Sequence, residues 1–187
     1  MSQGETRDHL LDAALVVIAD RGLHGLTMRA VSAEADSALG LVNYHFEDKD
    51  ALIVEAYERI VDRLISASMA AVERANSDHA KLTAFIETVF DEAFLNTDYL
   101  TLRLSLWAAA ASDGKIAELN TQLDRNYWNR LTDLIGRARP ELSSQDARDR
   151  ATDIMITQNG MWLTWVVRPD RDALERCRAQ CRAIVLH

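Results

Sequence analysis

The sequence predicts an all-α protein of about nine helices. Breaker residues are scarce, since the 187 residues include only 7 Gly and 2 Pro, which favours long helices over a many-turned β fold. Apolar residues recur every three or four positions through most of the chain, the period of an amphipathic helix. The segment 100–107 alternates leucines with period two, but we expect helix there because alanines continue it and no partner strand exists.

The first 48 residues are expected to form three short helices. Apolar residues at helical spacing mark the first, over about 11–18, and the segment 22–25 reads as a loop. Thr27 is a suitable N-cap for a second helix that runs to about Ala35. A turn of three or four residues then leads into a third helix over about 38–44.

Longer helices follow from Lys49 onward, which places a domain boundary between residues 48 and 49. Pro140 and Pro169 end two of these helices, and Ser143 or Ser144 begins the one between them. The expected helices start near Lys49 and then cover about 82–90, 100–111, 116–134, 144–165 and 174–184.

Several classes of function find no support in the sequence. The chain has no apolar run long enough to span a membrane and no secretory signal, so a soluble cytoplasmic protein is expected. Cys177 and Cys181 lie four residues apart without further ligands nearby, and no metal or cofactor is expected. A glycine-rich phosphate loop and a nucleophile elbow are both missing, which argues against an enzyme.

Two short helices joined by a tight turn are typical of a helix-turn-helix, whose second helix can enter the DNA major groove. The residues make this more specific. Gly22-Leu-His-Gly-Leu-Thr-Met-Arg-Ala-Val31, Gly40-Leu-Val-Asn-Tyr-His-Phe46 and Asp48-Lys-Asp-Ala-Leu52 occur in that order. Together they resemble the tetracycline-repressor (TetR) family over roughly residues 7–55. The resemblance implies a DNA-binding domain at 1–48 and a ligand-binding and dimerisation domain at 49–187.

The resemblance also assigns roles to residues of the first domain. Asn43 could read adenine, while leucines on the same helix could contact thymine methyl groups. Tyr44, His45 and Lys49 match positions that grip the DNA backbone, while Thr27 can donate to a phosphate. Arg29 matches a position that contacts a phosphate or a base edge. The DNA-binding residues implied are Thr27, Arg29, Leu39, Leu41, Asn43, Tyr44, His45 and Lys49.

Three features depart from the family pattern. Asp36 and Ser37 occupy the turn where Gly and Val are usual, and Asn43 stands where Tyr is common. Through Lys49 the chain also has four basic residues against eight acidic ones, a net charge of −4, and the whole chain carries −8. Because phosphate neutralisation supplies much of DNA affinity, this balance predicts either acids that face away from DNA or weak, salt-sensitive binding.

In the larger domain, Leu106-Trp-Ala108 and Asn159-Gly-Met-Trp-Leu163 resemble the betaine-biosynthesis repressor (BetI-like) branch. That likeness suggests a small cationic effector such as choline, held by aromatic faces. Aromatics at helical spacing are, however, core residues more often than walls of a ligand cage. The candidate pocket residues are Phe90, Phe94, Trp107, Tyr127 and Trp162, and those of a homodimer interface are Trp165, Val166, Cys177 and Cys181.

The sequence therefore predicts a one-component transcriptional regulator, most simply a repressor. It would bind a palindromic operator as a dimer and be released by a small-molecule effector. Release would follow from a tilt of the long helix that starts at Lys49. The alternative is a helical interaction or adaptor protein with a degenerate DNA-binding domain, and the acidic first domain is its only support.

Overall fold

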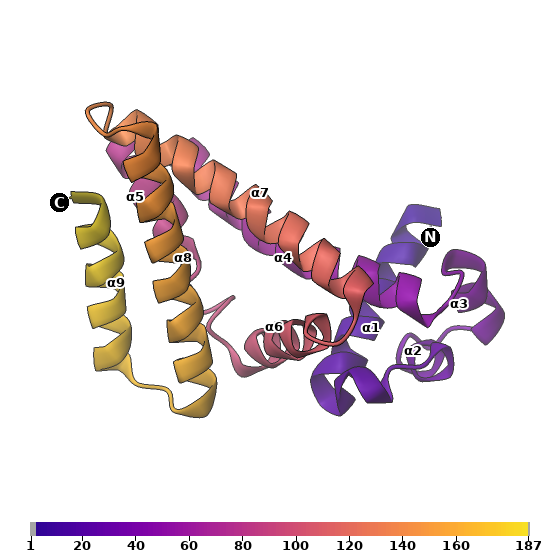
Figure 1. Ribbon diagram of the computed structural model, residues 1–187. Coiled ribbons are helices and arrows are strands. Elements are labelled where there is room, and N and C mark those ends of the chain that lie inside the picture. The colour runs from indigo at the N-terminus through magenta and orange to yellow at the C-terminus, as the bar shows by residue number, and fades with distance from the viewer. Residues whose placement is uncertain (1–2, 187) are drawn as a thin grey trace. The chain divides into compact units, whose positions relative to one another are not determined.

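The computed structural model describes residues 3–186. Within these residues it contains nine α-helices and no strand, which confirms the predicted all-α class (Figure 1). In chain order the helices are α1 (Gln3–Gly25), α2 (Met28–Glu34), α3 (Leu39–His45), α4 (Lys49–Arg74), α5 (Asp78–Thr88), α6 (Thr97–Ala110), α7 (Gly114–Ala138), α8 (Ser144–Val167) and α9 (Arg171–Leu186).

Most of the expected helix boundaries are close to the observed ones, with two exceptions. The loop expected at 22–25 is wrong, because α1 continues to Gly25. Gly22 nevertheless kinks the helix, with φ 67° and ψ 176°, a conformation that glycine adopts at little cost. Helix α5 ends at Thr88, before the expected Phe90, and turns occupy the residues up to Asn96.

The leucine-rich segment with period two is helical, as expected. Leu100, Leu102 and Leu106 are all buried within α6, which shows that this helix is apolar on more than one side.

The N-cap expected at Ser143 or Ser144 is present at Ser143. Ser143 accepts a hydrogen bond from the Asp146 N–H, and the Asp146 carboxylate accepts one from the Ser143 N–H, so α8 begins with a capping box.

The chain divides into two compact units. The first contains residues up to 62 together with 101–120, and the second contains 63–100 and the residues from 121 onward. The boundary predicted at 48/49 falls inside the first unit, because this unit also includes α4 up to residue 62, and Arg59 of α4 pairs with Asp8 and Asp12 of α1. The core of the first unit is built from side chains with at most 1% exposure: Leu10, Ile18, Leu26, Val31, Val42, Phe46, Leu52 and Tyr57.

In the second unit, α9 packs along α8 and also contacts α5, and Figure 1 shows α8 and α9 side by side. Its core includes Phe85, Leu131, Ile135, Ile154 and Cys181, all fully buried. Among the described residues, none of the helices is both long enough and apolar enough to cross a membrane.

Candidate nucleic-acid interface

Helix α2 begins at a well-formed cap. The Thr27 hydroxyl oxygen accepts a hydrogen bond from the Ala30 N–H at 3.0 Å, and Thr27 has the extended backbone of an N-cap. Thr27 and Arg29 are both exposed at this end of the helix. Their side chains are therefore available to a partner on the surface, as the sequence predicts.

The turn between α2 and α3 explains why Asp36 can replace the usual glycine. Asp36 has φ +46°, which lies in the left-handed region, and Asp is one of the few residues other than Gly that adopts it readily. Ser37 secures the turn, because its N–H donates to the Ser32 carbonyl at 2.9 Å and its hydroxyl to the Ala35 carbonyl at 3.1 Å. The unusual turn residues thus preserve the helix-turn-helix geometry.

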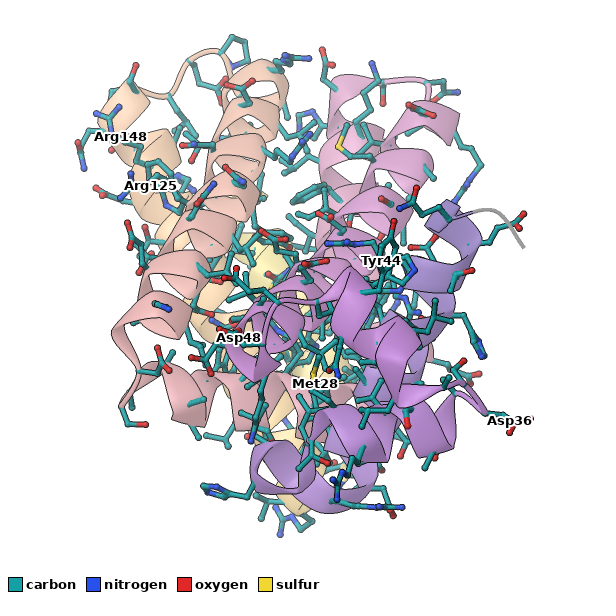
Figure 2. All side chains as sticks on the ribbon, turned by 90° about the vertical axis from the view of Figure 1, so that its right-hand side faces the viewer. Met28, Asp36, Tyr44, Asp48, Arg125 and Arg148 are labelled. Carbon is teal, nitrogen blue, oxygen red and sulfur yellow. The ribbon has the colours of Figure 1, made fainter. Side chains whose placement is uncertain are left out.

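Helix α3 has one buried face and one exposed face. Val42 is fully buried and Phe46, at its C-cap, is 1% exposed, so these two side chains anchor the helix in the first unit. On the opposite side, Asn43 is exposed, Leu41 is 36% exposed and Tyr44 is 71% exposed. Figure 2 looks onto this side of the first unit, with Met28, Asp36 and Tyr44 labelled.

Gly40 lies on the exposed side of α3. A Cβ atom built at Gly40 would meet no atom of the described chain within 4 Å. Packing inside the protein therefore does not require glycine there, whereas a partner that approaches the helix closely would. Leu39, one residue earlier, is half-buried.

The residues expected to grip the DNA backbone differ in their availability. The Tyr44 hydroxyl accepts a hydrogen bond from Gln3 Nε2 at 3.2 Å. The ring centroids of Tyr44 and His45 are 5.2 Å apart, and the two rings are nearly perpendicular. His45 is half-buried. Lys49 is half-buried too, and its Nζ donates to the Leu23 carbonyl at 3.1 Å. Its ammonium group thus helps to join α4 to the end of α1.

Three carboxylates of the first unit are paired with arginines that lie far from them in the sequence. Arg59 of α4 binds Asp8 and Asp12 of α1 at 2.8 and 2.9 Å, and hydrogen bonding to Asp12 raises the pKa of its guanidinium. Arg7 pairs with Glu55 in the same way. Nothing in the sequence pattern identifies these pairs, because their partners lie about 50 residues apart along the chain.

Comparison with known proteins identifies the family. A model described as "Bacterial regulatory proteins, tetR family" matches residues 10–56, and one described as "BetI-type transcriptional repressor, C-terminal" matches residues 78–187. The HTH-type transcriptional regulator BetI of Burkholderia thailandensis is 30% identical over 159 residues, or 84% of this chain and 80% of that protein. The chain belongs to the TetR family.

Solved structures agree with this assignment. A transcriptional regulator from Pseudomonas aeruginosa PAO1 superposes with a TM-score of 0.86 at 24% identity, covering 100% of this chain and 93% of that one. A regulator from Saccharomonospora viridis in complex with choline gives 0.82 at 20% identity, covering 98% and 97%. These likenesses show the fold. The protein is thus a DNA-binding transcriptional regulator of the TetR family with a BetI-type C-terminal region, and not an enzyme.

The aromatic residues expected around an effector pocket of this TetR-family regulator fall into both units. Phe90, Phe94, Tyr127 and Trp162 are buried in the second unit, whereas Trp107 is half-buried in the first. Tyr99, which sequence reasoning missed, lies between two of them. Its ring centroid is 5.1 Å from that of Phe94 and 5.8 Å from that of Trp162, edge to face in both cases.

The polar groups of Tyr127 and Trp162 are hydrogen-bonded within the second unit. The Tyr127 hydroxyl donates to Gln158 Oε1 at 3.1 Å, and Gln158 Nε2 donates to the Ile86 carbonyl at 3.2 Å. Trp162 Nε1 donates to the Val89 carbonyl at 3.0 Å. Burial raises the pKa of Tyr127 far above its ordinary value. The sequence places Gln158 on the same face of α8 as the apolar residues but does not predict its partners, because Tyr127 and Ile86 lie on other helices.

In the first unit, the face of Trp107 is occupied by a cation of the chain itself. The guanidinium carbon of Arg103 lies 5.0 Å from the Trp107 ring centroid and 5.4 Å from that of Tyr57. Arg103 is only 5% exposed. This arrangement is a cation–π contact of the kind that an aromatic cage would offer to a cationic ligand.

The residues expected at a dimer interface are less exposed than the surface around them. Cys181 is fully buried, and Trp165, Val166 and Cys177 are half-buried. The exposed apolar side chains of α8 are Ile156, Leu163 and Val167, at 65%, 54% and 80%. No group of three or more residues that could hold a metal ion occurs among the described residues.

Proposed function

We propose that this regulator is a repressor that binds a palindromic operator as a homodimer and is released from it by a small-molecule effector. The exposed face of α3 carries the proposal. A short helix with Val42 and Phe46 anchored in the core presents Gly40, Asn43 and Tyr44 outward, as a recognition helix must in order to enter the major groove.

Each exposed group on this face suits one part of a DNA duplex. The Asn43 amide can pair with the N6 and N7 edge of adenine, and Leu41 can contact a thymine methyl group. Tyr44 can donate its hydroxyl proton to a phosphate, and Thr27 and Arg29 lie where the first helix of the motif crosses the backbone. The proposed DNA-binding residues also include Leu39, His45 and Lys49, which are half-buried.

The exposed apolar face of α8 supports a homodimer. Ile156, Leu163 and Val167 are separated by seven and four residues, so they form one stripe along the helix, with Gly160 between them. A second copy could cover this stripe by packing its own α8 against it, with α9 and the half-buried Trp165 alongside. Two recognition helices would then read half-sites about 34–36 Å apart.

The effector of this proposed mechanism is a small molecule bound among the helices that follow α3. Choline is the first candidate to test, because the C-terminal match is BetI-type and the second unit gathers Phe90, Phe94 and Trp162. Trp107 gives weaker support for a cationic effector than the other aromatic residues do, because the guanidinium of Arg103 already lies over its ring. Effector binding that favours one position of α4, which continues from the first unit into the second, would change DNA affinity.

DNA binding can be tested without knowing the operator. The full-length protein would be used to select duplexes from a random-sequence pool, and dissociation constants would be measured for the selected duplex. We expect Tyr44→Ala to weaken binding by about tenfold, and Asn43→Ala to cost about 1–3 kcal/mol of discrimination at one A·T pair. Tyr44→Phe removes only the hydroxyl and keeps the ring, so it distinguishes the contribution of the hydroxyl to DNA affinity from that of the ring. Recovery of no preferred duplex at low or physiological salt would favour the adaptor alternative.

The dimer and the effector need separate measurements. Ile156→Glu should give a monomer in sedimentation experiments, while Val16→Glu, which alters a half-exposed valine of α1, should not. If Ile156→Glu remains dimeric, the stripe on α8 is not the interface. Choline should weaken binding to the selected duplex, and ethanolamine, which lacks the quaternary ammonium, should not. An unchanged dissociation constant with choline would exclude it as the effector.

A further inference from the structure

The C-terminal end of α3 is held by the first turns of α1. Arg7 Nη1 donates to the His45 carbonyl at 3.1 Å, and the Arg7 guanidinium carbon lies 5.1 Å from the centroid of the Phe46 ring. Gln3, one helical turn before Arg7, donates from Nε2 to the Tyr44 hydroxyl at 3.2 Å. Residues four apart lie on one face of a helix, so a single face of α1 meets three consecutive residues at the end of α3.

The same guanidinium is fixed to α4. Arg7 Nε donates to Glu55 Oε2 at 3.0 Å, and Nη2 forms the ion pair with the same oxygen. All three nitrogens of the Arg7 guanidinium are therefore engaged with groups of the chain itself. The Glu55 side chain is 24% exposed and that of Arg7 is 42% exposed, so the pair is partly shielded from water.

We propose that Arg7 is a positioning residue for DNA recognition, which holds the end of α3 against the Glu55 turn of α4. The inference rests on the proposed role of α3 in reading DNA. A displacement of Glu55 along with α4 would be passed through Arg7 to the His45 carbonyl, next to Asn43 and Tyr44. Arg7, Glu55 and the end of α3 form one contact unit, which we name the Arg7 clamp.

The chemistry of the clamp explains why arginine is required. The last carbonyls of a helix have no partner within the helix, and a cation there also complements the helix dipole. Arginine offers donors in a planar fork, so it can serve the His45 carbonyl and the Glu55 carboxylate at once, while its face covers Phe46. A lysine ammonium is a compact charge on a flexible stem and would not serve both partners in the same way.

A competing role for Arg7 is a direct contact with a DNA phosphate. The two roles predict opposite effects at Glu55. If only charge mattered, Glu55→Gln would remove a negative group from the protein and strengthen DNA binding. If Arg7 positions α3, Glu55→Gln weakens binding because the guanidinium loses its ion pair.

The experiment measures dissociation constants for a selected duplex and for a scrambled duplex over a series of salt concentrations. For Arg7→Ala the clamp predicts at least about a tenfold loss on the selected duplex, with little change on the scrambled one or in the salt slope. Loss of a phosphate contact would instead weaken both duplexes alike and reduce the slope. In addition, Arg7→Ala/Glu55→Ala should be no weaker than Arg7→Ala, because the two residues act together.

Controls separate the clamp from folding and from net charge. Arg21→Ala removes an exposed arginine of α1 whose ion pair is with its neighbour Asp20, and it should leave the selectivity between the two duplexes unchanged. Arg7→Lys and Glu55→Gln test the clamp if Arg7→Ala does not fold. The proposal would be overturned if Arg7→Lys binds the selected duplex as tightly as the unmodified protein does and Glu55→Gln binds it more tightly.

The outcome also separates the clamp from the proposed function. If Tyr44→Ala binds the selected duplex as well as the unmodified protein does, the reading role of α3 fails and the clamp fails with it. If Tyr44→Ala weakens binding while Arg7→Ala and Glu55→Gln do not, only the clamp is overturned. Weakening by all three, confined to the selected duplex for the Arg7 and Glu55 variants, supports both.

Discussion

The acidic balance of the sequence predicted salt-sensitive binding, but operator binding by this regulator should depend on salt less steeply than is usual for DNA-binding proteins, because few phosphate contacts release few counterions. Arg7, Arg21 and Arg59 are paired with carboxylates, which leaves Arg29 and Lys49 as the Arg and Lys side chains of residues 3–62 that can offer their charge to phosphate. Two cations in each protomer of a dimer give about four phosphate contacts and a log–log salt slope of about −3.6. Affinity would then fall about 150-fold between 50 and 200 mM salt, against 10³–10⁵-fold for proteins with roughly 6–10 contacts.

The slope can be measured by fluorescence anisotropy with the selected duplex at five or more salt concentrations. Arg29→Ala removes one cation from each protomer, so it should make the slope shallower by about 2. Arg125→Ala, an exposed arginine of α7 in the second unit, is the matched control and should leave the slope unchanged. A slope of about −7 or steeper would refute the reasoning, because it would require cations that the structure does not place near α3.

Two further predictions concern the second unit. Gln158→Ala leaves the buried Tyr127 hydroxyl and Ile86 carbonyl without this partner, so it should destabilise by about 2–5 kcal/mol and lower Tm by about 5–15 °C. Scanning calorimetry at fixed protein concentration tests this, with Gln145→Ala on the exposed side of α8 as control; equal melting temperatures for the two variants would contradict it. Because burial raises the pKa of Tyr127 above its unfolded value near 10, stability is complete below about pH 10 and falls as pH rises further, by at most about 1.4 kcal/mol per pH unit. Urea titrations from pH 9 to 11.5 should show a shallower loss for Tyr127→Phe, and parallel losses would show that Tyr127 does not ionise on unfolding.

The sequence predicted the secondary structure well because its signals are local. Thr27, Ser143 and Asn96 each accept a hydrogen bond from a backbone N–H within three residues, so the residue type alone indicates the start of a helix. The failures are also local. At Gly22 a positive φ kinks α1 without ending it, and helical periodicity carries no information about such a kink.

The candidate DNA-binding residues were predictable only in part. Asn43 and Tyr44 are exposed on α3 as expected, since a seven-residue helix with Val42 and Phe46 on its buried side has little freedom in which face it exposes. The sequence shows that Lys49 is charged but not which group its side chain contacts. In the structure its Nζ donates a hydrogen bond to the Leu23 carbonyl. The role of each of these residues in DNA recognition stays a prediction.

By itself, the sequence determined the all-α class, the helix order, the family and the position of the helix-turn-helix, because these depend on spacing and on motifs that are contiguous in the chain. Only the tertiary structure decided how the charges are distributed. The net charge of −4 through Lys49 does not say where the acidic side chains lie or what they contact, and the structure pairs Asp8 and Asp12 with Arg59 from a later helix. Ion pairs such as these and the Arg7 clamp join residues about 50 positions apart, and folding is what brings them within hydrogen-bonding distance.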